Sequence, residues 1–256
     1  MPHPLKHQID VLGSVLSSTL TGWRGTMTVE LALSPAQPLI LFDMEGCPYC
    51  RAVRENLTAL RLDALIQPCP KGGHRFRAEA QKLCGRQQFP LLLDPNTQTI
   101  MLESAAIIEY LWSSYGTGAT PSRLRPNPLS RTLSGLATAV RGMHGISATP
   151  SKAPDEPLHL WSFESSPYSR LVRERLCELE IPYILHNLGK EQWADIGPAR
   201  MRIKPGPYHP LPNGPRAALL ERVGRVQVPY LEDPNTGKNL FESADILEYL
   251  NQTYAR

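Results

Sequence analysis

An internal repeat constrains the fold of this chain more than any other feature. Cys47-Pro48-Tyr49-Cys50 returns 119 positions later as Ser166-Pro167-Tyr168-Ser169, with a hydroxyl in place of each sulfur. Apolar and charged positions downstream keep the same offset: Val53 and Val172, Leu57 and Leu176, Leu60 and Leu179, Arg54-Glu55 and Arg173-Glu174. At about 115 residues per copy, the repeat predicts two small domains rather than a solenoid.

Later motifs recur at an offset of 139, so the second copy carries an insertion of 20 residues. The matching pairs are Phe89-Pro90 with Val228-Pro229, Asp94-Pro95-Asn96-Thr97 with Asp233-Pro234-Asn235-Thr236, and Glu103-Ser104 with Glu242-Ser243. The insertion falls at about 197 to 215 and holds six prolines and three glycines, a composition that predicts a surface loop.

The overall composition indicates an ordinary soluble globular protein. Of the 256 residues, 41% are apolar and 20% charged, and the net charge of +3 comes without a basic run of the kind that binds nucleic acid. We find neither an apolar run long enough to span a membrane nor the core of a signal peptide, so we expect a cytoplasmic protein. The five cysteines are unevenly placed, which fits a reducing compartment better than a disulfide framework.

Each copy is expected to begin with an amphipathic helix. Leu5, Ile9, Leu12, Leu16 and Leu20 form one apolar stripe within residues 1–24, and Leu129, Leu133, Leu136 and Val140 form a similar stripe within residues 129–142. We expect these stripes to be packing faces, with docking to a membrane surface as the alternative. Trp23-Arg24-Gly25 aligns with Val140-Arg141-Gly142 at an offset of 117.

The remaining pattern predicts strand, helix, strand, helix, strand, strand, helix, twice over. In copy one the expected elements are a strand at 39–42, a helix through 51–60, a strand at 64–68, a helix near 75–83, a strand opened by Phe89-Pro90, a strand at 100–102, and a helix capped by Ser104. We divide the chain into an N-terminal helix and link (1–30), a first domain (31–120), a connecting helix and linker (121–156) and a second domain (157–256).

The Cys-Pro-Tyr-Cys motif falls at a strand-to-helix junction and predicts thiol-disulfide chemistry. A helix N-terminus stabilises a thiolate, so Cys47 is the expected nucleophile and Cys50 the expected resolving thiol. Zinc is the less favoured reading, because neither Cys69 nor Cys84 begins a second ligand pair, and we expect no metal. Cys69 is either a third redox thiol or a small apolar residue that ends a strand, whereas Cys84 and Cys177 are expected in the core.

These motifs together resemble the glutaredoxin and glutathione S-transferase N-terminal domain, which has a thioredoxin fold. The resemblance covers residues of about 38–116 and 157–256 and extends to Cys69-Pro70-Lys71-Gly72 and the Asp-Pro-Asn-Thr turns. The chain is similar to a tandem family found in bacteria and plastids. The fold class it implies is α/β, with two tandem thioredoxin-fold domains.

The resemblance also implies a glutathione site in copy one. The Phe89-Pro90 bond would be cis, and the backbone of Phe89 would pair with the cysteinyl part of glutathione. The helix N-terminus at Glu103-Ser104 would receive the γ-glutamyl carboxylate, unless Ser104 is a plain cap. Tyr49 would line the site. Lys71 would pair with the glycyl carboxylate, or belong with His74, Arg75 and Arg77 to a solvated basic face.

Copy two keeps part of this pattern. Ser166 would hold the thiolate of glutathione in the manner of serine-type transferases, beside a pocket formed by Val228, Pro229, Glu242 and Ser243. The alternative, which we favour, is that Ser166 caps a helix and copy two serves packing or substrate docking.

The leading functional prediction is an enzyme, a glutathione-linked thiol-disulfide oxidoreductase. Glutathione is its cosubstrate, and a disulfide-bearing protein or small molecule is its substrate. An ordinary transferase adds a large helical domain for the electrophile, and this chain lacks one, so conjugation is the second choice. A transferase or isomerase, a module that holds an iron-sulfur cluster with glutathione, and a redox-inert adaptor are the alternatives.

Overall fold

The computed structural model describes residues 4–29, 33–197 and 207–256. Residues 198–206 of the insertion predicted at 197–215 lie outside these ranges, so the expectation of a surface loop there stays a prediction. The division of the chain into four segments likewise stays a prediction.

The predicted order of elements occurs twice, and the tandem thioredoxin fold is confirmed. Copy one consists of β1 (Leu39–Asp43), α2 (Pro48–Leu60), β2 (Ala64–Pro68), α3 (Arg77–Cys84), β3 (Leu91–Asp94), β4 (Thr99–Leu102) and α4 (Ser104–Tyr115). Copy two consists of β5 (Leu158–Ser162), α6 (Pro167–Glu178), β6 (Tyr183–Asn187), α7 (Pro215–Val223), β7 (Tyr230–Asp233), β8 (Lys238–Leu240) and α8 (Ser243–Tyr254). Helices α1 (Pro4–Leu20) and α5 (Pro128–Val140) precede the two copies, and two short 3₁₀ turns, η1 (Ser122–Leu124) and η2 (Trp193–Asp195), lie in connections.

The two copies share one eight-stranded sheet in the order β4-β3-β1-β2-β6-β5-β7-β8. Strands β2 and β6 pair antiparallel across the middle, with Leu65 opposite Ile184. A single cluster of buried apolar side chains contains residues of both copies, among them Leu57 and Leu176. The sequence predicts two domains, and the structure joins them through backbone hydrogen bonds and a common core.

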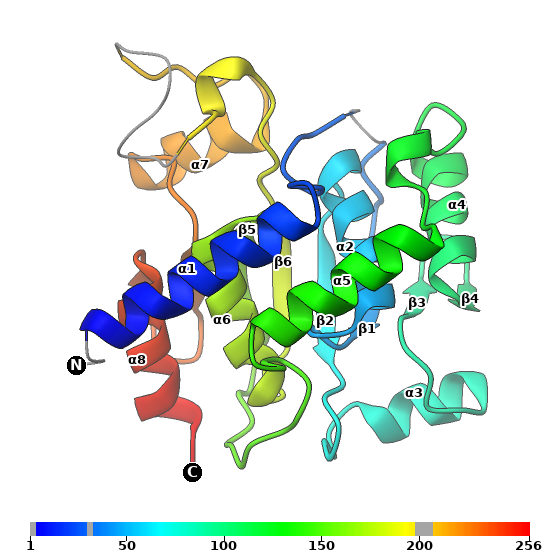
Figure 1. The fold of residues 1–256 in the computed structure, drawn as a ribbon, viewed down its shortest axis with the longest axis horizontal. Coiled ribbons are helices and arrows are strands. Elements are labelled where there is room, and N and C mark those ends of the chain that lie inside the picture. Colours follow the sequence, from blue (N-terminus) through cyan, green and yellow to red (C-terminus); the bar gives the residue numbers. More distant parts are fainter. Residues whose placement is uncertain (1–3, 30–32, 198–206) are drawn as a thin grey trace.

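Helices α1 and α5 form an extra layer over the sheet-covering helices (Figure 1). They lie side by side and run in opposite directions, α1 against α6 of copy two and α5 against α2 of copy one. Each helix therefore packs on the copy that it does not immediately precede. Of the helices in the described ranges, none combines the length and apolarity needed to cross a membrane.

The prediction that the leucine stripe of α1 packs inward is wrong. Leu5, Ile9, Leu12 and Leu16 are 64%, 60%, 67% and 49% exposed, and Leu20 is half-buried. The buried face of α1 instead carries small polar side chains, because the surface beneath it is polar. Those side chains are Ser14, Ser17 and Ser18; Val11 is also buried, and Thr21 continues the buried polar row just after the helix.

Contacts of these serines show why this face turns inward. The Ser17 hydroxyl accepts hydrogen bonds from the guanidinium groups of Arg51 and Arg170, and the Ser18 hydroxyl donates to the Ser165 carbonyl at 2.8 Å. Helix α5 shows the same inversion, with Leu129 and Leu136 exposed and Ser130 and Ser134 buried.

The alignment of Trp23-Arg24-Gly25 with Val140-Arg141-Gly142 is also wrong. The structure pairs Gly22-Trp23-Arg24-Gly25 with Gly142-Met143-His144-Gly145, an offset of 120, because φ is positive at the first, second and fourth positions of both segments. Gly25 lies close to copy two, where an added Cβ would be 2.6 Å from the Glu164 Cβ. Gly145 lies close to copy one, where an added Cβ would be 2.8 Å from the Glu45 Cβ.

Candidate functional site

Both cysteines of the motif lie at the first turn of α2. Cys47 occupies the N-cap with an extended backbone, and Pro48 begins the helix. Cys47 is 7% exposed and Cys50 fully buried. The strand-to-helix junction places one sulfur at the end of the helix and the other against its body, as the spacing predicts.

The two thiols differ in acidity. A hydrogen bond from the Cys50 thiol lowers the pKa of Cys47 to about 7, and the backbone N–H groups of Cys50 and Tyr49 act in the same direction. Burial raises the pKa of Cys50 well above its ordinary value. Near neutral pH, Cys47 is therefore partly ionised, whereas Cys50 keeps its proton.

Helix α5 and the segment after it cover the loop that carries Cys47. The Thr138 hydroxyl donates to the Gly46 carbonyl at 2.9 Å, and the Gly46 N–H donates to the Gly145 carbonyl at 3.2 Å. A Cβ added at Gly46 would lie 2.5 Å from Cγ1 of Ile146. The residue that precedes Cys47 is therefore packed against a segment of the connection between the copies.

A buried carboxyl lies at the end of β1, before the cysteine loop. Both oxygens of Asp43 are 2.7 Å from Nη1 of Arg54. Burial raises the pKa of Asp43 to about 6, although the Arg54 guanidinium opposes this rise. The charge of Asp43 in turn raises the pKa of both Cys47 and Cys50. The equivalent residue in copy two, which lacks the thiols, is Ser162.

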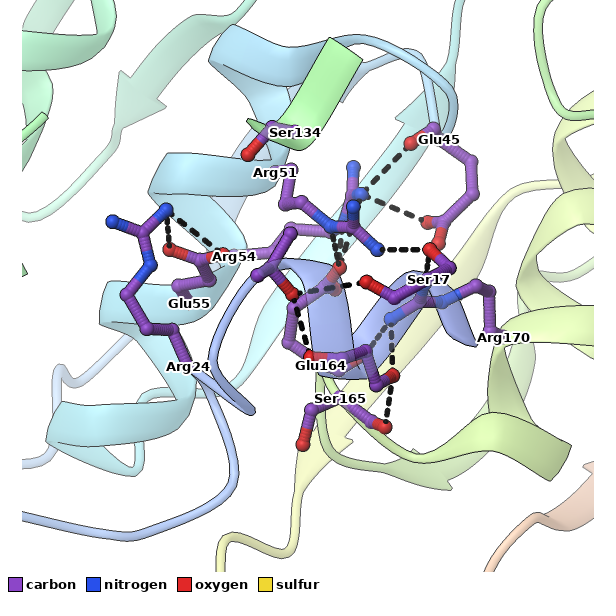
Figure 2. A network of polar contacts seen from close by, with 12 residues as sticks. Ser17, Arg24, Glu45, Arg51, Arg54, Glu55, Ser134, Glu164, Ser165 and Arg170 are labelled. Atoms are coloured by element: carbon purple, nitrogen blue, oxygen red, sulfur yellow. Dashed lines mark hydrogen bonds and ion pairs between the residues drawn. The ribbon is translucent and has the colours of Figure 1, made fainter. Parts of the chain in front are cut away.

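Through Arg54, Asp43 is linked to a buried ionic network between the copies. Figure 2 shows the part of this network around Arg54 and Glu164. Nε of Arg54 lies 2.9 Å from Oε2 of Glu164, and Nε of Arg51 lies 3.3 Å from Oε1 of the same carboxylate. In the reverse direction, Arg173 of copy two lies 3.0 Å from Glu45 of copy one. Arg54 and Arg173 are repeat equivalents, as are Glu45 and Glu164, so the network is nearly symmetric.

The arginines determine the charge state of this network. Burial opposes ionisation of Glu164, but Arg173, Arg54 and Arg51 together hold its pKa well below the ordinary range. Sequence analysis found the Arg54-Glu55 repeat and assigned it no role, because contacts more than 100 residues apart leave no local spacing signal.

Two predicted glutathione residues, Tyr49 and Ser104, line one shallow depression. The guanidinium of Arg131 on α5 lies 5.5 Å from the centre of the Tyr49 ring. The complete lining is Arg24, Pro48, Tyr49, Ala52, Ser104, Pro126, Ser130, Arg131 and Ser134. Sequence reasoning missed these roles of Arg24, Arg131 and the two α5 serines, because Arg24 was noted only as part of a repeat and the other three lie outside every recognisable motif.

Glu103 and Ser104 lie at the start of α4, in a geometry that differs from the predicted cap. Glu103, not Ser104, occupies the N-cap, with φ of 71°, and Ser104 is the first helical residue and buried. The Gln88 side chain donates to Oε1 of Glu103 at 2.5 Å. Copy two repeats this arrangement, with Glu242 at φ 46° and Gln227 donating to it at 2.9 Å.

The structure gives the other predicted residues distinct settings. The Phe89-Pro90 and Val228-Pro229 bonds are both cis. Lys71 has an exposed side chain, and its backbone N–H donates to the Ile146 carbonyl at 2.6 Å. Arg75 does not belong to a free basic face, because its guanidinium donates to the carbonyls of Leu179 and Glu180 in copy two.

The remaining cysteines are not exposed. Burial raises the pKa of Cys69, which favours the reading of this residue as a strand-ending apolar side chain. Cys177 is buried and Cys84 half-buried. Among the residues that the structure describes, no group of three or more His, Cys, Asp or Glu side chains is arranged to hold a metal ion.

In copy two, the residues of the predicted second site are engaged by the protein itself. The Ser166 hydroxyl accepts from the Ser169 N–H at 3.3 Å as a helix cap, and Ser166 is 2% exposed. Nε2 of His7, from α1, lies 3.2 Å from the Ser243 hydroxyl. The end of α1 thus contacts the place where the γ-glutamyl carboxylate was expected.

Comparison with known proteins gives a match in both copies. Residues 41–121 and 160–256 match the model of the glutathione S-transferase N-terminal domain. A search of curated proteins finds no match. Among solved structures, a glutathione transferase of Bombyx mori is 29% identical over 33% of this chain and 39% of that chain, with a TM-score of 0.30.

Proposed function

Because the chain belongs to the glutathione S-transferase N-terminal domain family, we propose that it is a glutathione-linked thiol-disulfide oxidoreductase acting through Cys47 and Cys50. The observation that carries this proposal is the opposite shift of the two thiols: the pKa of Cys47 falls to about 7, and that of Cys50 rises. A dithiol used only for packing has no need of one acidic sulfur at a helix N-terminus.

The reaction follows from this asymmetry. The Cys47 thiolate attacks one sulfur of a substrate disulfide, and the other sulfur leaves as a thiolate that takes up a proton. Cys50 then loses its proton and attacks the Cys47 sulfur of the mixed disulfide, which releases the second substrate thiol and leaves a Cys47–Cys50 disulfide. One glutathione thiolate opens this disulfide, and a second releases oxidised glutathione, so both cysteines are reduced again.

In this proposal the γ-glutamyl end of glutathione binds beside Tyr49 and Ser104. The N-terminus of α4 and the Arg131 guanidinium supply donors and positive charge for the γ-glutamyl carboxylate. In this proposal the Phe89 backbone, next to the cis Pro90, pairs with the cysteinyl part, and Lys71 pairs with the glycyl carboxylate. Copy two serves as a packing partner, since Ser166 and Ser243 are engaged within the chain.

A glutathione-coupled assay with a small-molecule disulfide tests the role of the thiols. We expect Cys47→Ser to lose more than 100-fold in rate, because Cys47 is the nucleophile of the proposed reaction and Cys50 keeps its proton. Cys50→Ser should still reduce glutathione mixed disulfides, which require Cys47 alone, but should fail on protein disulfides. Full activity in Cys47→Ser would exclude the proposal, and full glutathione-conjugating activity in both variants would favour the transferase alternative.

Arg131→Ala tests the glutathione site. It should raise the KM for glutathione about tenfold and leave the pKa of Cys47 unchanged, because Arg131 contacts Tyr49 and not the sulfur. The matched control is Arg123→Ala, an exposed arginine on η1 that does not line the depression. Equal KM values for glutathione in the two variants would show that Arg131 does not bind the γ-glutamyl carboxylate.

A further inference from the structure

The outer faces of α1 and α5 present an unusual apolar surface. Leu5, Ile9, Leu12 and Leu16 of α1 are 49–67% exposed, and Leu129 and Leu136 of α5 are 68% and 51% exposed. These six side chains are called here the leucine face. Helices α1 and α5 lie side by side in the outer layer (Figure 1), and both rows of side chains are exposed.

The leucine face is not the ordinary scatter of surface apolar residues. A surface helix normally turns its apolar stripe inward and its polar residues to solvent. Both helices do the opposite, burying serines such as Ser17 and Ser134 and exposing leucines. Contiguous exposed apolar patches of this kind mark interaction sites in soluble proteins.

The size of the leucine face suits a protein partner. Helices of 17 and 13 residues are roughly 25 and 20 Å long, and two adjacent helices are roughly 20 Å wide. The face therefore measures on the order of 500 Å² on each copy, so pairing two such faces covers on the order of 1,000 Å² in total, the lower bound for a specific interface.

The charge of the leucine face argues against a lipid surface. The two helices contain three residues of the types Lys, Arg, Asp and Glu, namely Lys6, Asp10 and Arg131. The Asp10 carboxylate lies 3.8 Å from the Arg141 guanidinium. Binding to anionic membranes requires clusters of about four to eight basic residues. A nearly uncharged face instead matches another nearly uncharged face.

The internal symmetry of the chain identifies the matching face. Helices α1 and α5 run in opposite directions and precede equivalent repeats, so an approximate two-fold axis relates the two helices, of which α1 contributes four residues of the leucine face and α5 two. We propose that the leucine face is the interface of a homodimer, in which the α1 and α5 rows of one chain pack on those of a second copy. Such a contact uses the same patch twice and closes without forming a chain of molecules.

Sedimentation velocity of the reduced chain from about 1 to 100 µM tests this proposal. The mass should rise from 28.5 kDa to twice that value. A Leu12→Glu/Leu136→Glu variant should stay monomeric, with a dimer Kd at least 100-fold weaker, because each dimer would bury unpaired charges. The matched control is Leu33→Glu, since Leu33 is 73% exposed and lies outside both helices. A native chain that is monomeric throughout, or a double variant that dimerises normally, overturns the proposal.

Two further measurements keep the test decisive if the double variant fails to fold. Hydroxyl-radical labelling of the native chain should show lower oxidation of Leu12 and Leu136 at 100 µM than at 1 µM, with Leu33 unchanged; equal labelling contradicts the dimer. Flotation with phosphatidylcholine and phosphatidylglycerol vesicles should leave the protein in the aqueous fraction. A monomer that floats with the vesicles would assign the leucine face to lipid instead.

Discussion

Cys47 and Cys50 lie three positions apart and still have different chemistry, since each sulfur meets a different environment. The Cys47 sulfur accepts hydrogen bonds from the Cys50 thiol and from backbone N–H groups, all of which favour its thiolate. The Cys50 sulfur is enclosed and donates its proton to its neighbour, so its thiolate is disfavoured. The acidity of Cys47 therefore depends on the residue at position 50.

Replacing Cys50 tests this dependence. Cys50→Ser keeps a donor, so the midpoint of Cys47 alkylation should stay near pH 7. Cys50→Ala removes the donor and should raise the midpoint toward the 8.5 of a free thiol, which slows alkylation at pH 7 roughly tenfold. Iodoacetamide labelling followed by mass spectrometry measures both. Identical midpoints in the two variants would show that the backbone alone sets the acidity.

Asp43 should give the stability of the protein a particular pH dependence. Its pKa is about 6 in the folded state, against about 4 in an unfolded chain, so only the folded state holds this proton between pH 4 and 6. The contribution is present at about pH 4 and lost as the pH rises through 6, at a cost of up to about 3 kcal/mol. Asp43→Asn should reduce the decline in the free energy of unfolding, measured in urea at each pH, and Glu55, whose pKa burial raises to about 7, should account for the decline that remains. A decline of equal slope in both proteins would assign it to other groups.

At the scale of elements, the segment after α5 packs closely on the cysteine loop. Gly145 lets this segment approach Glu45 closely, because a side chain there would meet the Glu45 Cβ at 2.8 Å and φ is +72°. Gly142 has a similar φ of +63°, but a Cβ there would meet its nearest atom, of His144, at 4.0 Å. The two glycines differ in their surroundings and not in their backbone.

This difference gives a matched pair of variants. Gly142→Ala should cost about 1 kcal/mol of stability from backbone strain alone. Gly145→Ala should cost about 3 kcal/mol or more, because the added methyl group also displaces the segment, and it should speed alkylation of Cys47. Urea unfolding and labelling rates provide the comparison. Equal losses in the two variants would mean that the contact with Glu45 contributes nothing.

At the scale of the whole molecule, the ionic network and the shared sheet couple the copies. Glu164 of copy two neutralises Arg51 and Arg54 of copy one and lies 3.1 Å from Arg173 of its own copy. All of these groups are buried, so loss of one partner leaves others uncompensated. Both copies should therefore unfold together.

Glu164→Gln should destabilise the protein by about 3 to 5 kcal/mol, as expected when one partner of a buried ionic group is removed. Glu232→Gln, which weakens a pair with the 58% exposed Arg222, should cost about 1 kcal/mol or less. Circular dichroism and tryptophan fluorescence should follow one transition in each case. Two separated transitions in the native protein would show that the copies fold independently.

The sequence was sufficient to predict the order of elements, the tandem fold and the place of Cys47, since each rests on local motifs seen twice. The orientation of α1 was mispredicted, because a stripe of leucines shows which face is apolar and not what lies beneath the opposite face. Arg51, Arg54 and Glu164 escaped notice because their contacts join distant parts of the chain. The β2–β6 pairing left no signal, since a central strand and an edge strand of this length read alike.

The joining of β2 and β6 also has an evolutionary consequence. In a homodimer encoded by a single copy of a gene, every substitution appears on both sides of the symmetry axis. Here the two halves belong to one polypeptide, so a substitution can change one half and leave the equivalent position of the other half unchanged. Cys47 persists opposite Ser166, and Asp43 opposite Ser162, within a scaffold that still requires both halves. Duplication followed by divergence thus allows one side to specialise in chemistry while the other specialises in support.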